Sequence, residues 1–404
     1  MEQFRPNLPD EGNWSGDRLM HYGFVWSFKL RRYSKGSNTV KRVAIIGAAG
    51  YVGLELARQL RGVDYEVNAV TRENGRFLLR DSGFNVVPPG DIASLKTVDI
   101  VVNLAYPSTG PLQYYPTRNE EILGQIKTIT GPGTRIIHVS TQAVFGYGFE
   151  RPVVTGPVET VRDYAYVEAK IQLENLLVRQ FNSNSVQIVR LGNVWGPGSP
   201  NWTVALVNKV LFGEPVGIEG IAGYCNATDV ANTASYLSFL IDSDELRGLH
   251  FYHLAELSSH RWSTWIKRIE TALGQDSVML PNLPLTADNW KQELREALTP
   301  LRPGPLYKSL AGSRVSGSAV RALIRTIGDQ QFNKAKKRFV KTLPSGYTLG
   351  PSEATFLNLM SCQTQFETQV LDRWQPPVDF ETSWSRVEAW MNTAGYSVSG
   401  IQKC

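Results

Sequence analysis

The stretch KRVAIIGAAGYVGLELARQL, residues 41–60, decides the fold class of this chain. Residues 43–46 are apolar, as in a buried strand, and from residue 54 the apolar positions recur at helical spacing. Three glycines at G-x-x-G-x-x-G spacing lie between the two patterns, where they allow a tight turn and the close approach of a pyrophosphate to the start of the helix. The stretch predicts a dinucleotide site formed by Gly47, Gly50, Tyr51, Val52 and Gly53.

The alternation of strand and helix continues along the chain. Residues 65–70, 85–87, 98–104 and 135–139 are expected strands, and residues 118–129 and 162–181 have helical periodicity. The run VDIVVNL at 98–104 is apolar almost throughout, which is typical of a parallel strand covered on both faces. The sequence therefore predicts an α/β fold, a Rossmann doubly wound parallel sheet with a smaller C-terminal substrate-binding lobe.

The expected division of the 404 residues is an N-terminal extension at 1–40, a NAD(P)-binding domain at 41–195 to which 225–255 return, and a substrate-binding lobe at 196–224 and 256–404. The lobe includes a basic insertion at about 281–350, where twelve Lys or Arg face four acidic residues. Its net charge of +8 exceeds the +5 of the whole chain. Such charge would attract an anionic substrate, an acidic partner or a membrane surface. The alternative is that it forms the solvated face of a helix at 321–338.

Composition limits the remaining function classes. The chain has 42% hydrophobic and 20% charged residues, and its three cysteines match neither a disulfide framework nor a metal-ligand spacing. The histidines fit no common metal pattern, so we expect no metal. The sequence has no bilayer-spanning apolar window and no secretory signal, which favours a cytoplasmic protein without membrane contact. The basic insertion carries no recognition motif, so nucleic acid is not an expected partner.

The cofactor preference depends on the end of the second strand. This strand ends in Thr71-Arg72, and no acidic residue stands there to accept a hydrogen bond from the ribose 2′-hydroxyl of NAD. An arginine suits the 2′-phosphate of NADP instead. The sequence therefore predicts NAD(P) as cofactor and favours NADP(H) over NAD(H), with Arg72 as a solvated loop charge being the alternative.

A candidate catalytic pair lies on the helix expected at 162–181. Tyr166 and Lys170 are four residues apart, so their side chains lie on one helix face. An ammonium group beside a phenol stabilises the phenolate and lowers the tyrosine pKa, which makes Tyr166 a usable acid or base.

These motifs, in this order, resemble the extended short-chain dehydrogenase/reductase superfamily and its NAD-dependent epimerase/dehydratase family. Besides the glycine turn and the Tyr-x-x-x-Lys pair, the matching segments are GDI at 90–92, NLA at 103–105, Asn119, STQAVFG at 140–146, RLGNVWGPG at 190–198, NATDVA at 226–231 and the closing stretch 374–396. The resemblance covers about residues 41–275 and 363–396. By analogy with the family, it also implies a homodimer with the helix of Tyr166 in the contact.

The resemblance implies hydride transfer between a nicotinamide and a carbon that bears oxygen. Tyr166 would give or take the hydroxyl proton, Thr141 would hydrogen-bond the carbonyl oxygen, and Lys170 would hold the nicotinamide ribose. The implied cofactor site also includes Asp91, Ile92, Leu104, Ala105 and Asn119, with Tyr166 and Lys170. The implied substrate site consists of Thr141, Gln142 and Asn193.

Departures from the family pattern narrow the reaction. Gln142 and Ala143 stand where the family's dehydratases carry Asp-Glu, which disfavours dehydration. Residues 220–225 lack the arginine by which family epimerases clamp a diphosphate, although Arg302 or Arg314 could replace it.

Three functional hypotheses follow for a small-molecule substrate. The first is an epimerase or ketoreductase of a sugar-like, nucleotide-linked substrate. The second is an NADP-dependent reductase or dehydrogenase of a non-nucleotide secondary alcohol, such as a sterol or secondary metabolite, for which Trp195, Trp202 and Tyr224 would suit a flat apolar substrate. The third is a dinucleotide-sensing protein without turnover, against which the intact Thr141, Tyr166 and Lys170 argue.

Overall fold

The fold is known from a computed structural model. It describes residues 40–280 and 359–396, apart from 62–64, 96, 107–114, 147–148, 150, 160–164, 183 and 221–222. The expected N-terminal extension, the basic insertion with its helix at 321–338, and Arg302 and Arg314 lie outside the described residues.

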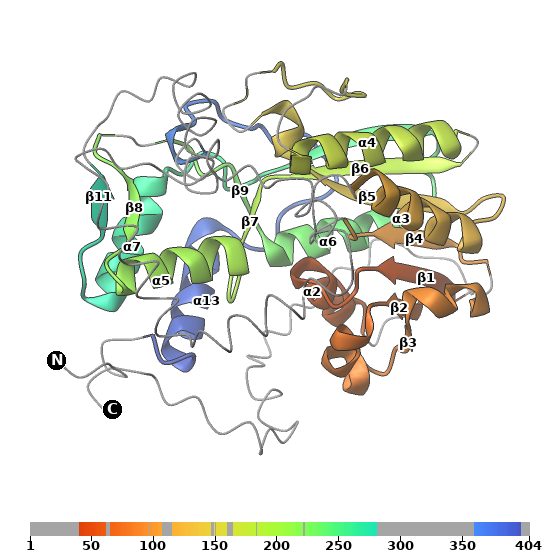
Figure 1. The fold of residues 1–404 in the computed structure, drawn as a ribbon, viewed down its shortest axis with the longest axis horizontal. Helices are drawn as coiled ribbons and strands as arrows, with labels where there is room; N and C mark the ends of the chain where they lie inside the picture. Colours follow the sequence, from red (N-terminus) through yellow and green to blue (C-terminus); the bar gives the residue numbers. More distant parts are fainter. Residues whose placement is uncertain are drawn as a thin grey trace, which may run out of the picture. The chain divides into compact units, whose positions relative to one another are not determined.

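A seven-stranded parallel sheet forms the centre of the fold (Figure 1). Its order is β10-β6-β5-β4-β1-β2-β3, and every neighbouring pair is parallel. The strands are β1 (Lys41–Ile46), β2 (Tyr65–Val70), β3 (Asn85–Val87), β4 (Ile100–Asn103), β5 (Arg135–Thr141), β6 (Ser185–Leu191) and β10 (Leu249–Leu254). The sheet confirms the predicted fold class. It also places β1 at the point where the strand order reverses, and crevices at such points hold ligands.

Several of the expected element boundaries differ from those observed. β5 runs two residues beyond the expected end at 139, and the helix expected at 162–181 ends at Gln180. β4 (Ile100–Asn103) is shorter than the run at 98–104. The Asp99 N–H still bonds to the Arg42 carbonyl of β1, but the Val98 N–H bonds to the Ile129 carbonyl of a helix. The helix α3 (Tyr115–Ile129) begins three residues before the expected start at 118. It contains Pro116 in its first turn, where a missing N–H costs no hydrogen bond.

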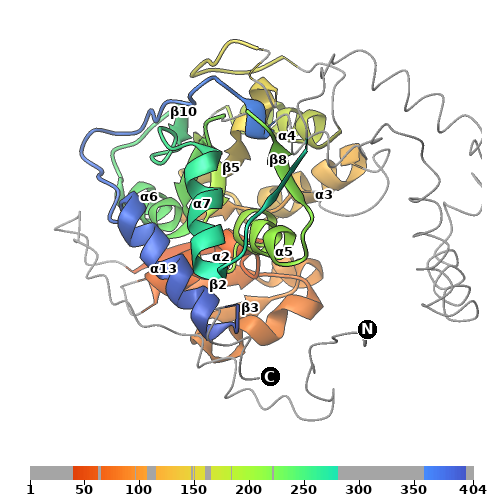
Figure 2. The ribbon, with the colours of Figure 1, turned by 90° about the vertical axis from the view of Figure 1, so that its left-hand side faces the viewer.

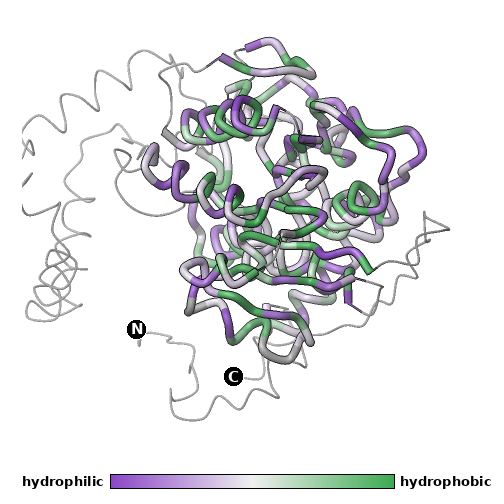
Figure 3. Tube along the Cα trace, turned by 90° about the vertical axis from the view of Figure 1, so that its right-hand side faces the viewer, coloured by the Kyte–Doolittle hydropathy of each residue, from purple (hydrophilic) through white to green (hydrophobic). Residues whose placement is uncertain are grey.

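Helices cover both faces of the sheet. Val43 and Ile45 of β1 pack in the core shared with α2 (Tyr51–Leu60) and α6 (Val230–Asp242). Ala44 and Ile46 point to the opposite core, which contains residues of α3 and α4 (Ala165–Gln180). Apolar residues therefore concentrate along the central strands, as the hydropathy colouring in Figure 3 shows.

A smaller group of elements lies beyond the carboxyl ends of the strands in Figure 1 and faces the viewer in Figure 2. It comprises β7 (Asn193–Trp195), η5 (Pro200–Val204), α5 (Ala205–Leu211), β8 (Pro215–Ile218), β9 (Ala227–Asp229), α7 (Trp262–Leu273), β11 (Val278–Leu280) and α13 (Phe380–Thr393). Its core is aromatic: the Trp195 and Trp265 ring centroids are 3.7 Å apart, and Trp202 stacks on Trp262 at 5.1 Å.

The C-terminal segment returns to the large sheet before it forms α13. His253 of β10 and Gln369 exchange backbone hydrogen bonds of 3.0 and 2.8 Å as an antiparallel bridge. The chain then passes Trp374, which is buried against Tyr236 of α6. Among the described helices, none is both long and apolar enough to cross a bilayer.

Candidate active site

The glycine turn connects β1 to α2. Gly47 has a φ of +88°, and a Cβ there would lie 3.1 Å from the Ala105 nitrogen. A Cβ on Gly53 would lie 2.5 Å from the Gly47 carbonyl oxygen, so the helix packs on the turn only with glycine. Gly50 is the N-cap of α2 and provides no capping side chain. The start of the helix can therefore receive an anion such as a pyrophosphate.

The end of β4 lies directly against this turn. The Leu104 N–H donates to the Ile46 carbonyl at 2.9 Å, and the Ala105 N–H donates to Asn103 Oδ1 at 3.1 Å. Asn103 is fully buried, and its Nδ2 lies 3.0 Å from His138 Nδ1 on β5. Burial and the charge of Lys170 lower the His138 pKa well below its ordinary value, so this imidazole is neutral. These contacts fix the predicted cofactor residues Leu104 and Ala105 against the glycine turn.

Tyr51 and Val52, the next predicted residues of the turn, are half-buried in the first turn of α2. The Tyr51 hydroxyl donates to the Pro197 carbonyl at 3.1 Å. Burial, and then the negative charge of Asp229, raise the Tyr51 pKa well above its ordinary value. Tyr51 is therefore a neutral phenol that connects the glycine turn to the loop after β7.

Thr71, Arg72, Asp91 and Ile92 lie at or beyond the ends of β2 and β3. Thr71 is buried, and its N–H donates to the Val87 carbonyl at 3.1 Å. Arg72 is exposed at the start of η1 (Glu73–Ser82). Asp91 is exposed on η2 (Pro89–Ser94), whereas Ile92 packs in the core. Arg72 and Asp91 are therefore the members of this set that a ligand at this edge can reach.

Asn119 is buried between two helices. Its Nδ2 donates to the Ala169 carbonyl at 2.9 Å and to Gln172 Oε1 at 2.8 Å, both on α4. Both amide hydrogens therefore brace α3 against α4, while Oδ1 has no hydrogen-bond partner among the described residues. Any contact of this side chain with a cofactor would have to use that oxygen.

The predicted catalytic residues come from β5 and α4. Lys170 is 4% exposed, and its Nζ donates to the Val139 carbonyl at 3.2 Å, two residues before Thr141. Burial lowers the Lys170 pKa to about 8, against which the nearby Glu174 carboxylate raises it. Thr141 ends β5, and its Oγ1 accepts from the Ala143 N–H at 3.2 Å, which leaves the hydroxyl hydrogen available to a ligand.

Tyr106, which is not among the residues predicted from the sequence, joins this group. Its ring centroid lies 4.6 Å from Lys170 Nζ and 5.6 Å from the Tyr166 ring in an edge-to-face arrangement. Because Tyr106 follows Ala105, the end of β4 touches both the glycine turn and the Tyr166–Lys170 pair. Its position directly after the NLA motif at 103–105 was the one signal in the sequence that could have identified it.

The two further predicted substrate residues differ in their surroundings. Gln142 is 3% exposed in η4 (Gln142–Phe145), and its Oε1 has no hydrogen-bond partner among the described residues. Asn193 of β7 is half-buried, and its Nδ2 donates to the Cys225 carbonyl at 2.7 Å. The Asn193 amide therefore already holds β7 against the segment before β9.

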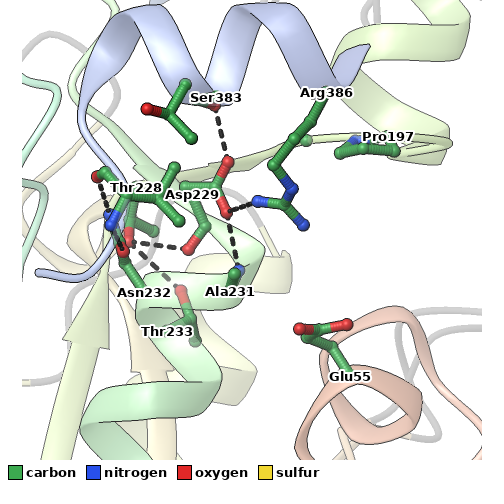
Figure 4. A network of polar contacts seen from close by, with 12 residues as sticks. Glu55, Pro197, Thr228, Asp229, Ala231, Asn232, Thr233, Ser383 and Arg386 are labelled. Carbon is green, nitrogen blue, oxygen red and sulfur yellow. Dashed lines mark hydrogen bonds and ion pairs between the residues drawn. The ribbon is translucent and has the colours of Figure 1, made fainter. Parts of the chain in front are cut away.

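A buried polar network anchors α13 to the start of α6 (Figure 4). Asp229, the N-cap of α6, is fully buried and accepts from the Ala231 N–H at 2.7 Å and from Ser383 Oγ at 2.6 Å. Arg386 Nη1 lies 2.8 Å from the same carboxylate. The NATDVA motif pointed to Asp229, but its partners on α13 could not be found from the sequence.

A separate cavity of about 910 Å³ lies along the edge of β10. It is lined by Leu249, Tyr252 and Glu256 together with Gln369 and Trp374 of the C-terminal segment, among others. None of the predicted site residues lines it. The described residues contain no group of three or more His, Cys, Asp or Glu placed to hold a metal ion.

Comparison with known proteins identifies a family. Residues 43–233 match the NAD dependent epimerase/dehydratase family. ADP-L-glycero-D-manno-heptose-6-epimerase from Helicobacter pylori superposes with a TM-score of 0.50 at 16% identity, over 62% of this chain and 88% of that one. UDP-glucose 4-epimerase from Bifidobacterium longum, solved with NAD+ and UDP, gives a TM-score of 0.47 at 20% identity, over 60% and 86%. No curated protein matches the chain. The family match confirms the predicted superfamily. The similarity to the Helicobacter structure confirms the predicted fold.

Proposed function

We propose that this chain, an enzyme whose residues 43–233 belong to the NAD-dependent epimerase/dehydratase family, epimerises or reduces a sugar-like, nucleotide-linked substrate by hydride transfer. The observation that carries the proposal is the end of β4. There Ala105 abuts Gly47, and the next residue, Tyr106, touches Tyr166 and Lys170. A dinucleotide on the turn would thus extend toward the candidate catalytic pair.

The glycine turn has the shape that such a cofactor needs. Gly47 and Gly53 let the end of β4 and the start of α2 pack directly on the turn, where a Cβ would meet backbone atoms, and α2 starts without a side-chain cap. When bound, NAD(P) supplies the hydride acceptor or donor. The preference for NADP(H) rests on Arg72, whose exposed side chain at the end of β2 is available to a 2′-phosphate.

The chain's own residues would manage the proton and the carbonyl oxygen. Thr141 would donate its hydroxyl hydrogen to the substrate oxygen, since its Oγ1 already accepts from Ala143. Tyr166 would transfer the proton, and Lys170 would hold the nicotinamide ribose and favour the phenolate through its positive charge. A homodimer with α4, the helix of Tyr166, in the contact stays a prediction.

A cation near residues 220–225 supports a nucleotide-linked substrate. This segment has no arginine of its own, but the Arg261 guanidinium carbon lies 4.3 Å from the centroid of the Tyr224 ring. Arg261 stands at the N-cap of α7 and pairs with Tyr224 in an antiparallel bridge. It could therefore bind a diphosphate where the family pattern lacks its usual residue.

The alternative, a reductase of a flat apolar alcohol, loses part of its support. Trp195 is 1% exposed and packs against Trp265, so its ring belongs to the core of the lobe. Trp202 stacks on Trp262. Of the three aromatic residues that would suit such a substrate, Tyr224 has its ring beneath the Arg261 guanidinium, which favours a polar ligand.

The test is a turnover assay with the purified chain. We would incubate it with UDP-glucose and UDP-N-acetylglucosamine, identify the products by mass spectrometry and NMR, and follow cofactor absorbance. An epimerase forms product without net consumption of NAD(P)H, whereas a reductase oxidises one NAD(P)H for each product molecule. Absence of any bound dinucleotide, by mass spectrometry and by titration with NAD(H) and NADP(H), would contradict the proposal.

A further inference from the structure

Tyr106 occupies an unusual place for a large aromatic residue. It is 39% exposed, so it does not belong to the core, yet its ring contacts two side chains of α4. The ring centroid is 4.6 Å from Lys170 Nζ, within the range of a cation–π interaction, and 5.6 Å from the Tyr166 ring at an interplanar angle of 79°. One side chain from the end of β4 thus touches both members of the candidate catalytic pair.

The surroundings of Lys170 explain why such a contact matters. The ammonium is 4% exposed, and burial favours its neutral form. Its Nζ donates to the Val139 carbonyl, and the Glu174 carboxylate favours the charged form. Glu174, however, is already engaged by Arg190 at 2.7 Å, with both side chains almost completely buried. The carboxylate is therefore shared between two cations.

His138, the other titratable residue near Lys170, does not offset the cost of the buried ammonium. His138 on β5 is fully buried and neutral, so it contributes no negative charge to offset the ammonium. The Tyr106 ring presents the negative face of its quadrupole to Lys170 and adds attraction without a second buried charge. The ring provides this attraction from a partly exposed position at the end of β4.

We propose that Tyr106 is a positioning residue, which stabilises the Lys170 ammonium through its ring and holds Tyr166 edge-on for proton transfer. The inference rests on the proposed function for its catalytic meaning, but the contact between ring and ammonium can be tested without turnover. The ring, and not the Tyr106 hydroxyl, carries the effect. Phenylalanine at position 106 should therefore preserve the stabilisation of the Lys170 ammonium, whereas an aliphatic residue of similar size should not.

The experiment compares Tyr106→Phe with Tyr106→Leu in the full chain. Lysines are labelled at Cε with ¹³C, the Lys170 resonance is assigned by its loss in Lys170→Arg, and its pKa is read from an NMR titration. We expect wild type and Tyr106→Phe to agree, and Tyr106→Leu to titrate lower by about half to one pH unit. An unchanged value in Tyr106→Leu, or an equal fall in Tyr106→Phe, would overturn the proposal.

Two further measurements separate this inference from folding and from the proposed function. Thermal unfolding of both variants shows whether a shift reflects loss of structure. Once a substrate is known, the alkaline limb of kcat/KM should move to lower pH in Tyr106→Leu alone. If no substrate turns over, the NMR titration still decides the role of Tyr106, and only the proposed reaction fails.

Discussion

Arg386 on α13 reaches the fully buried carboxylate of Asp229, with 2.8 Å between Nη1 and Oδ1. Nearly 160 residues separate the two along the chain, yet Asp229 also caps α6 and interacts electrostatically with Tyr51 of the glycine turn. The C-terminal helix is therefore joined to the expected cofactor site through one buried anion (Figure 4).

Removal of the arginine should expose the cost of that anion. Arg386→Gln leaves Asp229 buried without its cation, which should lower the free energy of unfolding by about 3–5 kcal/mol in urea denaturation. Glu381→Gln is the matched control on the same helix, because its ion pair with Arg268 is exposed. That control should leave the unfolding midpoint nearly unchanged. Equal effects of the two substitutions would contradict a special role for the buried pair.

Replacement of Lys170, unlike that of Arg386, should raise the free energy of unfolding. Its pKa of about 8 in the folded chain lies below the ordinary value of 10.5, so the folded state bears the cost of a buried ammonium at pH 7. Lys170→Met should therefore stabilise the chain at pH 7 by at most about 3 kcal/mol, less the loss of its hydrogen bond to Val139.

The pH dependence checks the sign of this effect. Between pH 8 and 10.5 the unfolded chain binds more protons at Lys170 than the folded chain, so wild-type stability should rise toward that of Lys170→Met. Urea denaturation at pH 7 and pH 10 measures the difference, with Lys127→Met, on α3, as the surface control. If the difference in free energy of unfolding between wild type and Lys170→Met stays constant with pH, burial does not destabilise the Lys170 ammonium.

The third prediction concerns steric fit at the glycine turn. A Cβ on Gly53 would meet backbone oxygens at 2.5 and 2.6 Å, so Gly53→Ala must push α2 away from the turn and should abolish dinucleotide binding in calorimetric titration. Gly124 of α3 is the control, because a Cβ there meets nothing within 4 Å. Gly124→Ala should bind the cofactor normally and gain up to about 1 kcal/mol of stability.

The sequence predicted the features that depend on neighbouring residues, but not the contacts between residues far apart in the chain. β2 and β3 have the predicted bounds because apolar runs between turn residues are local signals. The glycine turn was predictable for the same reason. The neighbours of Tyr106 and Asp229 were not, since Lys170 and Arg386 come from distant helices and no periodicity records which helices pack together. Asn119 was selected by resemblance, whereas its neighbours on α4 show a bracing contact.

Tyr166 provides the fourth prediction, on catalysis. Tyr166→Phe removes the transferable proton but keeps the ring that packs against Tyr106, so turnover should fall by about 10²–10⁴-fold with cofactor affinity nearly unchanged. Tyr65→Phe is the control: it loses a hydroxyl bonded to Asp242 at the start of β2, away from the carboxyl edge of the sheet. Full activity of Tyr166→Phe would end the proposed mechanism.

The fifth prediction concerns Arg72, an exposed cation two residues after the end of β2. If it binds the 2′-phosphate of NADP, Arg72→Gln should weaken NADPH binding by about tenfold or more while NADH binding stays within twofold, since only NADPH carries the phosphate. Arg61→Gln, an exposed residue just after α2, changes the net charge equally and controls for long-range attraction. Fluorescence titration with both cofactors measures the ratio of dissociation constants. Wild-type protein that binds NADH more tightly than NADPH would contradict the NADP preference, and parallel losses in Arg72→Gln would assign Arg72 to the shared part of the dinucleotide.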